Sequence, residues 1–233
     1  MSDRREGREQ NKEGSSPLSP ALPHEGGGSS AKEGSFPLSP ALPHEGGGSS
    51  AVEVLLVDGS PRGRGRTAAV LAAVAAGTVE AGAHPVTLAL SGELAARADE
   101  VVAQASKFDA FVFGSPTYRA TYTAELKYLL DRIPRGMDGE EVAPLRARAT
   151  AIVLTGASWH HFLALDSLRN VLGGFFGAFV IPPGLYVPRA GFTDEGDLGE
   201  QWREQAALQG RALVELARAI RGSSDLGRLG PHV

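Results

Sequence analysis

Short apolar runs alternate with longer amphipathic segments from Val52 almost to the end of the chain. The runs are rich in β-branched residues and Leu, as buried strands are, and the segments between them have helical periodicity. We predict strands at 52–57, 85–90, 110–113, 149–154 and 178–187, the last interrupted by Pro182-Pro183-Gly184. We predict helices at 68–82, 94–106, 121–133, 163–176 and 196–221.

This alternation predicts one α/β domain over residues 52–221, followed by a flexible tail at 222–233. Strands separated by helices form a parallel sheet that is covered on both faces. Right-handed crossovers make the sheet doubly wound and place the ligand crevice at the carboxyl ends of its strands. The loops after the first, third and fourth strands are therefore the candidate binding loops.

The first 51 residues have a different pattern, because they contain a tandem repeat. Residues 12–31 and 32–51 are identical except that Ser16 corresponds to Phe36. This segment is rich in Pro and Gly and poor in apolar residues, so we expect it to be disordered. A further hypothesis is that it is translated intergenic repeat and that the native start lies near Val52.

Composition narrows the function classes. The 233-residue chain has no cysteine, which excludes disulfides, a thiolate nucleophile and a Cys-based metal site. A formal net charge of −4 argues against a protein that coats nucleic acid and against a strongly acidic electron shuttle. No run of 18 apolar residues or signal-peptide core is present, so we expect no membrane partner and a cytoplasmic location.

A loop rich in Gly, Ser and Arg joins the first strand to the first helix. Backbone N–H groups at a helix N-terminus lack intrahelical partners and attract anions. Further donors come from the hydroxyls of Ser60 and Thr67 and from the guanidinium groups of Arg62, Arg64 and Arg66. The layout predicts a phosphate site; a solvated basic helix start is the alternative.

Two nucleotide motifs fit this loop poorly. A Walker A loop needs Gly and Lys where the nearest frame has Ser60 and Arg66. A dinucleotide fingerprint can be placed on Gly63, Gly65 and Ala68, but it begins too far beyond the strand, and no acidic residue ends the second strand. A mononucleotide such as FMN fits better.

The loop after the third strand contains Pro116-Thr117-Tyr118-Arg119, which offers backbone N–H groups and an aromatic face to a planar ligand. After the fourth strand, the small residues Gly156-Ala157-Ser158 let a ring approach the backbone closely. Tyr122 is either part of this site or an ordinary half-buried aromatic residue.

His160 and His161 follow the third candidate loop. Adjacent histidines rarely ligate one ion, and no Glu has the spacing of a zinc protease motif, so we predict no metal site. His161 with Asp166 is a candidate catalytic pair, but a local hydrogen bond at a helix start is the favoured interpretation.

These loops make the chain resemble the NAD(P)H-dependent FMN reductases of the flavodoxin-like class, particularly those that supply reduced FMN to alkanesulfonate monooxygenases. The resemblance covers about residues 54–219. It rests on Gly59-Ser60-Pro61-Arg62 with Arg66-Thr67, on Ser115 to Arg119, on Tyr122 to Asp131, and on His161, Leu163, Asp166, Leu168 and Arg169.

The resemblance implies a five-stranded sheet of order 2-1-3-4-5 with helices on both faces, and it implies roles for the three loops. Ser60, Arg62, Arg66 and Thr67 would hold the FMN phosphate. Pro116, Thr117, Tyr118 and Arg119 would line the isoalloxazine ring, and Gly156, Ala157 and Ser158 would close over its pyrimidine side. Similar members carry Ser at the position of Gly65, so we expect weaker phosphate binding here.

The implied activity is hydride transfer from NADPH or NADH to FMN, with no side chain nominated as a catalytic acid or base. The implied partner is a monooxygenase that receives reduced FMN, and the implied assembly is a homodimer or homotetramer formed through the helix that carries Tyr122 to Asp131. Three alternatives stay open: an FMN-containing quinone or azo reductase, a non-enzymatic electron carrier similar to flavodoxin, and an FMN-binding regulatory or interaction module.

Overall fold

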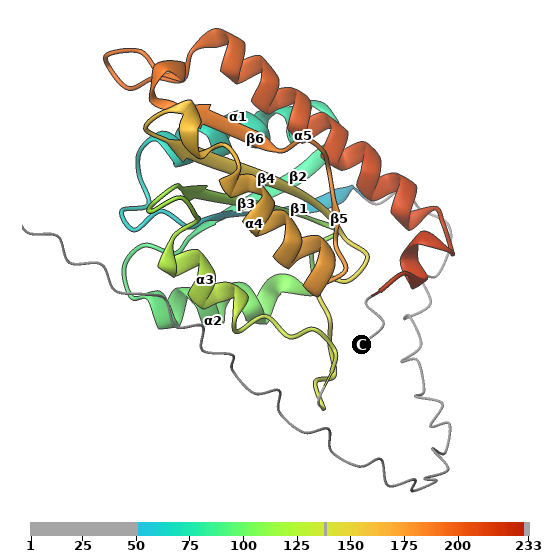
Figure 1. The fold of residues 1–233 in the computed structure, drawn as a ribbon. Coiled ribbons are helices and arrows are strands. Elements are labelled where there is room, and N and C mark those ends of the chain that lie inside the picture. Colours follow the sequence, from blue (N-terminus) through green and yellow to red (C-terminus); the bar gives the residue numbers. More distant parts are fainter. Residues whose placement is uncertain (1–50, 138, 231–233) are drawn as a thin grey trace, which may run out of the picture. The chain divides into compact units, whose positions relative to one another are not determined.

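The computed structural model describes residues 51–137 and 139–230 (Figure 1). The predicted repeat tail lies outside this part of the chain, except for Ala51. The strands are β1 (Val52–Asp58), β2 (Ala83–Ala89), β3 (Ala110–Pro116), β4 (Ala149–Gly156), β5 (Phe179–Val180) and β6 (Leu185–Pro188).

All strand pairs are parallel, and the sheet has the order β2-β1-β3-β4-β5. This confirms the predicted flavodoxin-like, doubly wound topology. The predicted fifth strand is two short strands that both pair with β4: Val180 lies beside Thr150, and Leu185 lies beside Val153. The interruption coincides with Pro182-Pro183-Gly184, where proline has no N–H to donate to a ladder.

Helices cover both faces of the sheet, as predicted. The helices α1 (Arg66–Glu80) and α5 (Glu200–Arg221) lie on one face. The helices α2 (Leu94–Ala105), α3 (Ala124–Leu130) and α4 (Ala164–Arg169) lie on the other. Figure 1 shows α1 and α5 on the opposite side of the sheet from α2 and α3.

The sequence of β1 explains why it is central. Val54 and Leu56 contact the core beneath α1 and α5, whereas Leu55 and Val57 contact the core beneath α2, α3 and α4, and all four are fully buried. A strand with period-2 side chains is apolar throughout only when both faces are covered. Helices α1 and α5 approach each other closely, since a Cβ at Gly210 would lie 2.2 Å from the carbonyl oxygen of Val74.

Several helix ends differ from the predictions because tertiary contacts set them. Helix α3 begins three residues later than predicted from Thr121, since Thr123 caps it by accepting a hydrogen bond from the Leu126 N–H. Beyond Arg169, α4 continues as a π-helical turn, Asn170–Phe175, that includes Gly173 and Gly174. Helix α5 starts at Glu200 rather than at the predicted Gly196.

The chain after α5 contains a 3-10 turn, Leu226–Arg228, and Leu226 packs against the core beneath α1 and α5. The flexibility predicted for this tail stays a prediction. Among the described residues, no helix is long and apolar enough to cross a membrane.

Candidate functional site

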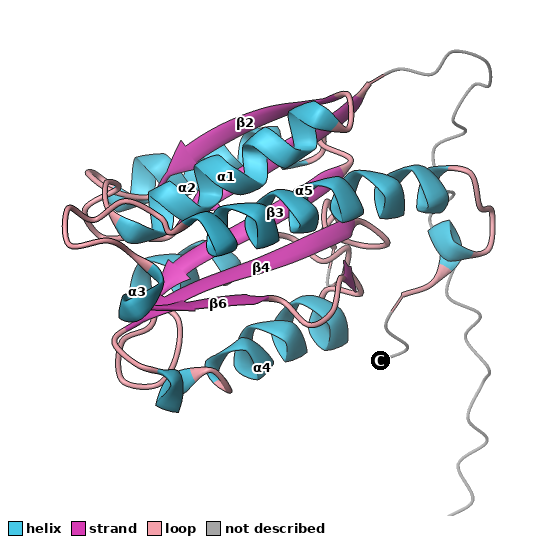
Figure 2. Cartoon of the chain, turned by 90° about the horizontal axis from the view of Figure 1, so that it is seen from above, coloured by secondary structure: helices cyan, strands magenta, loops and turns pink. Residues whose placement is uncertain are grey.

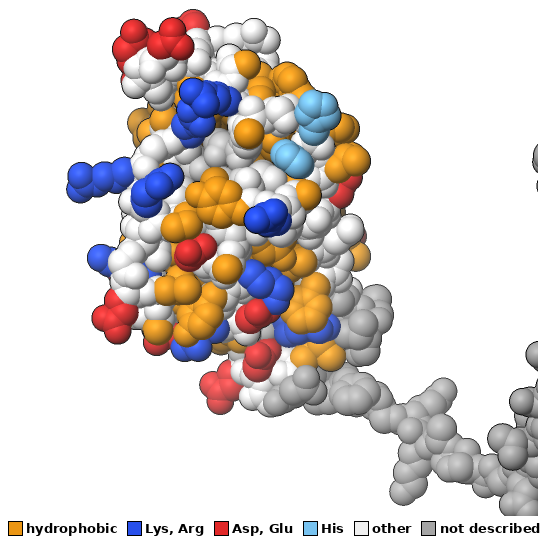
Figure 3. All heavy atoms as spheres, turned by 60° about the vertical axis from the view of Figure 1, so that its left-hand side comes forward, with side chains coloured by type: hydrophobic (Ala, Val, Ile, Leu, Met, Phe, Trp, Pro, Cys, Tyr) orange, Lys and Arg blue, Asp and Glu red, His pale blue; other side chains and the backbone are white. Residues whose placement is uncertain are grey.

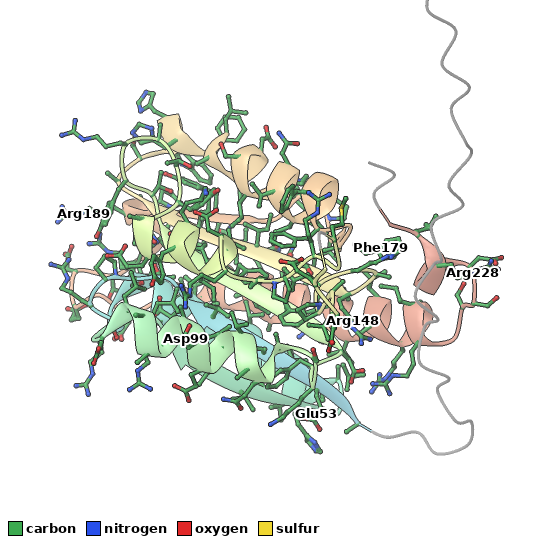
Figure 4. All side chains as sticks on the ribbon, turned by 90° about the horizontal axis from the view of Figure 1, so that it is seen from below. Glu53, Asp99, Arg148, Phe179, Arg189 and Arg228 are labelled. Carbon is green, nitrogen blue, oxygen red and sulfur yellow. The ribbon has the colours of Figure 1, made fainter. Side chains whose placement is uncertain are left out.

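The three candidate loops lie at one edge of the sheet, because they follow the carboxyl ends of parallel strands. In Figure 2 the arrowheads of the strands point toward this edge. Figure 4 shows Arg189, which follows β6, on the same side. Glu53 and Phe179, at the starts of β1 and β5, and Arg148, just before β4, lie toward the opposite end of the sheet (Figure 4). In Figure 3 basic side chains are spread over the forward face among hydrophobic ones, and histidine side chains lie close together.

The loop between β1 and α1 is held against β3 at its first residue. The Gly59 N–H donates to the Gly114 carbonyl over 2.8 Å, and a Cβ at Gly59 would lie 2.9 Å from the Leu126 Cβ. Only glycine fits this close approach. Next, the Ser60 N–H donates to Asp58 Oδ1 over 2.9 Å, which forms an Asx turn at the start of the loop.

The N-terminus of α1 is suited to an anion. Its N-cap is Gly65, which supplies no side-chain cap, and no acidic residue lies in the first turn. The first N–H groups of this helix therefore keep the donors and the positive dipole end that a phosphate would use.

The backbone of Gly65 explains why serine is absent there. Its φ of 139° and ψ of −153° belong to a region that is essentially restricted to glycine. A Cβ at this position would have no heavy atom within 4 Å, so the backbone conformation and not the available space requires glycine.

Two predicted phosphate residues at the start of α1 are fixed by long-range contacts. Thr67 is buried, and its hydroxyl lies 2.9 Å from that of Thr155 on β4. The Arg66 guanidinium lies 5.5 Å from the ring centre of Phe192, in a cation–π arrangement. The hydroxyl of Thr67 therefore joins the first turn of α1 to the end of β4, while its backbone N–H stays at the helix N-terminus.

The loop between β3 and α3 is a tight hairpin. The backbones of Tyr118 and Thr121 exchange hydrogen bonds of 2.9 and 3.2 Å, and the Thr117 N–H donates to the Thr155 carbonyl over 2.6 Å. Arg119 and Ala120, at the tip, have φ angles of 51° and 65°. Non-glycine residues rarely adopt this left-handed conformation, and such strain clusters at ligand-binding sites. Tyr118 is 49% exposed beside the tip.

A buried hydroxyl network ties this hairpin to the β1–α1 loop. The Thr123 hydroxyl donates to the Gly59 carbonyl over 2.7 Å and accepts from the Leu126 N–H over 3.2 Å. The Thr123 N–H donates to Ser115 Oγ over 3.0 Å. Both hydroxyl side chains are buried, so these bonds are protected from competition with water.

The loop after β4 rests on Tyr186 of β6. The Tyr186 hydroxyl donates to the Ser158 carbonyl over 2.7 Å, and a Cβ at Gly156 would lie 1.9 Å from that hydroxyl oxygen. Burial raises the pKa of the Tyr186 hydroxyl. The ring of Trp159 lies 6.1 Å from Tyr186 and 5.7 Å from Trp202 of α5.

Comparisons with known proteins agree with this geometry. Residues 52–191 match the family model of the NADPH-dependent FMN reductases. The chain belongs to the NADPH-dependent FMN reductase family.

Two relatives of this chain are NADH-dependent FMN reductases named SfnF. The protein from Pseudomonas putida is 33% identical over 58% of this chain and 76% of its own length. The protein from Pseudomonas fluorescens (strain Pf0-1) is 32% identical over 48% of this chain and 57% of its own. The chain thus spans little more than half the length of some relatives that it matches. A solved NADH:FMN oxidoreductase, EMOB, shares the fold with a TM-score of 0.60 and 21% identity, over 77% of this chain and 95% of that one.

In this FMN reductase, all predicted site residues lie at the carboxyl edge of the sheet, although not all of them contact one another. Ser60, Arg62, Arg66 and Thr67 lie on the first loop or the first turn of α1, Pro116 to Arg119 on the hairpin, and Gly156 to Ser158 after β4. Arg62 is exposed and has no hydrogen bond or ion pair within residues 51–137 and 139–230. Binding of FMN by these residues stays a prediction.

The histidines beside the third loop make only a local contact. His160 Nδ1 lies 3.0 Å from Ser158 Oγ. The local hydrogen bond was predicted for His161, and that prediction stays a prediction. Asp166 pairs with Arg169. In the part of the chain that the structure describes, no three His, Cys, Asp or Glu side chains form a group that could hold a metal ion.

Tyr122 is only 9% exposed and packs into the core beneath α2, α3 and α4. Burial raises the pKa of its hydroxyl. It is therefore a core residue within one copy of the chain.

A hollow of about 540 Å³ lies away from the predicted FMN loops. It lies between α1 and the start of α5, lined by Ala69, Ala72, Ala73, Ala76, Glu80, Asp197, Leu198, Glu200, Arg203, Glu204 and Ala207. The candidate site is therefore not this hollow but the open edge of the sheet where the loops after β1, β3 and β4 meet.

The residues that organise these loops were not predicted from the sequence. Thr155 is hydrogen-bonded to the Thr67 hydroxyl and accepts the Thr117 N–H. The Thr123 hydroxyl donates to the Gly59 carbonyl, and the Tyr186 hydroxyl donates to the Ser158 carbonyl. Asp58 also escaped notice, although a carboxylate at the end of an apolar strand is a visible signal. The other three have no local signature, because their partners are distant in sequence.

Proposed function

We propose that this protein is an NAD(P)H-dependent FMN reductase. The observation that carries the proposal is the joining of three loops, by buried hydrogen bonds, at the carboxyl edge of the sheet. Thr123 connects its hairpin to Gly59 of the phosphate loop, and Thr67 at the start of α1 is bonded to Thr155 at the end of β4, where the third loop begins. This edge includes the switch point between β1 and β3, where doubly wound sheets bind ligands.

The residues present fit an FMN phosphate. The uncapped N-terminus of α1 offers free donors, and Arg62 and Arg66 provide cationic side chains beside it. Charge-assisted bonds from guanidinium groups to phosphate are short and strong. FMN would supply the hydride-accepting ring system.

The contribution of the protein is then binding and orientation. The strained hairpin at Arg119 and Ala120 presents Tyr118 at the edge, and Gly156 lets the third loop lie close to Tyr186. Backbone N–H groups of these loops would stabilise negative charge that builds up on a bound flavin. No side chain is assigned as a proton donor or acceptor.

The proposed acceptor of reduced FMN is a flavin-dependent monooxygenase, on the resemblance of the three loops to the sulfonate-linked reductases. The proposed assembly is a homodimer or homotetramer that uses α3. We place the reaction in the cytoplasm, where reduced nicotinamide cofactors are produced.

Steady-state oxidation of NADH and NADPH with FMN, FAD and riboflavin tests the proposal. We expect oxidation that depends on added flavin and is fastest with FMN. Absence of flavin-dependent oxidation would falsify the assignment. Flavin retained through gel filtration, together with ping-pong kinetics on a quinone, would instead identify a quinone or azo reductase. Bound flavin without NAD(P)H turnover would identify a non-enzymatic protein, either an FMN-binding regulatory or interaction module or an electron carrier.

A further inference from the structure

Asp58, the last residue of β1, is a buried carboxylate, and only one of its two oxygens accepts a hydrogen bond. Its side chain is 1% exposed. Oδ1 accepts the Ser60 N–H over 2.9 Å, whereas Oδ2 is shielded from solvent and has no hydrogen-bond partner among the described residues. Buried carboxylates usually satisfy both oxygens, because an unpaired buried charge is costly.

The position of Asp58 places this charge under the phosphate loop. Side chains alternate along β1, so Asp58 faces the same side as Val54 and Leu56, the side covered by α1. Its neighbours in register are Ala89 of β2 and Gly114 of β3, and neither carries a charge. No ion pair to Asp58 is formed within residues 51–137 and 139–230, although Arg62, Arg64 and Arg66 lie on the adjoining loop.

One backbone donor of the loop is therefore occupied by a carboxylate that belongs to the chain. The Ser60 N–H, which adjoins a side chain expected to bind phosphate, is directed to Asp58. A phosphate dianion in this loop would have one donor fewer, and the buried carboxylate beneath the loop would oppose its negative charge. Like charges at short range disfavour one another more strongly where water is excluded.

We infer that Asp58 is an affinity-setting residue: its carboxylate competes with the flavin phosphate for the loop, so that FMN binds weakly and exchanges as a substrate. The inference rests on the proposed function and deepens it.

The Asp58→Asn variant isolates this charge. Asn keeps a side-chain oxygen that can accept the Ser60 N–H, preserves the size of the side chain, and removes the negative charge. We expect the dissociation constant of FMN to fall about tenfold, equivalent to about 1.4 kcal/mol. Riboflavin, which has no phosphate, should bind within about twofold of wild type.

The measurement is equilibrium titration of the full chain with FMN and with riboflavin, followed by flavin fluorescence. Asp225→Asn is the matched control, because it makes the same change of net charge at an exposed position near the C-terminal turn, and it should alter neither affinity. Asp58→Ser is the second variant if Asp58→Asn does not fold, since Ser also keeps an oxygen acceptor.

The outcomes separate the two proposals. Tighter FMN binding with unchanged riboflavin binding supports the role of Asp58. FMN binding that is unchanged or weaker in a folded Asp58 variant overturns it, as does an equal gain for both flavins. Wild-type protein that binds neither flavin overturns the proposed function itself, which a negative result for Asp58 alone would leave standing.

Discussion

The Thr123→Val substitution tests whether one buried hydroxyl both caps α3 and holds the phosphate loop. Valine has nearly the same shape as threonine, so the change removes hydrogen bonds with little change in packing. It removes the bond to the Gly59 carbonyl and the cap on the Leu126 N–H.

The expected loss of stability follows from these two bonds. Loss of a threonine N-cap costs about 1 kcal/mol. A buried carbonyl left without its partner costs about 1–3 kcal/mol, so the free energy of unfolding should fall by about 2–4 kcal/mol. In a domain of this size, that corresponds to a decrease in melting temperature of roughly 5–15 °C.

Urea unfolding measures this loss through the change in midpoint at constant slope. Thr121→Val is the matched control, because Thr121 lies on the same hairpin and its hydroxyl makes no hydrogen bond to the described residues. The control should change stability by less than about 0.5 kcal/mol. FMN should also bind more weakly to Thr123→Val, since Gly59 loses an anchor. A loss below about 0.5 kcal/mol would refute the assigned role of Thr123.

Three further changes have expected outcomes. Ala120→Gly should raise the free energy of unfolding by about 0.5–1 kcal/mol, because glycine adopts a φ of 65° without strain; reduced stability in thermal unfolding would contradict this. Arg66→Met should raise the dissociation constant of FMN about tenfold and leave that of riboflavin nearly unchanged in equilibrium titrations; an equal change for both would exclude a phosphate contact. Burial raises the pKa of Tyr122 above its ordinary value of 10.0, so the folded state favours the neutral hydroxyl. The contribution of this group to the free energy of unfolding is therefore full below that pH and is lost as the pH rises through the raised pKa. Tyr122→Phe should therefore lose less stability than wild type between neutral and strongly alkaline pH, and identical urea profiles would exclude this contribution.

The fold was predictable because β1, β3 and β4 are short apolar runs and helices separate them. Such strands need cover on both faces, which restricts the topology. The ends of α3 and α5 were less predictable, since they depend on contacts formed only in the folded chain. Thr123 ends the hairpin and begins α3 through bonds to Gly59 and Leu126, a combination that local sequence does not specify.

The candidate site divides in the same way. The donors around Ser60 and Arg66 are local to one loop and were recognised from residue type. The pairing of Thr67 with Thr155 was not recognised, because it spans 88 positions and depends on the order of the strands. The unpaired oxygen of Asp58 also needed the structure, since solvent exposure decides whether a carboxylate at a strand end is isolated.

Anaerobic single-turnover kinetics test the central claim most directly. NADH or NADPH would be mixed with FMN in the presence and absence of the protein, and the loss of oxidised-flavin absorbance would be followed. The account predicts that the protein strongly accelerates this loss, that the rate saturates with FMN, and that riboflavin reacts less efficiently at equal concentration. An unchanged rate in the presence of folded protein would contradict the assignment.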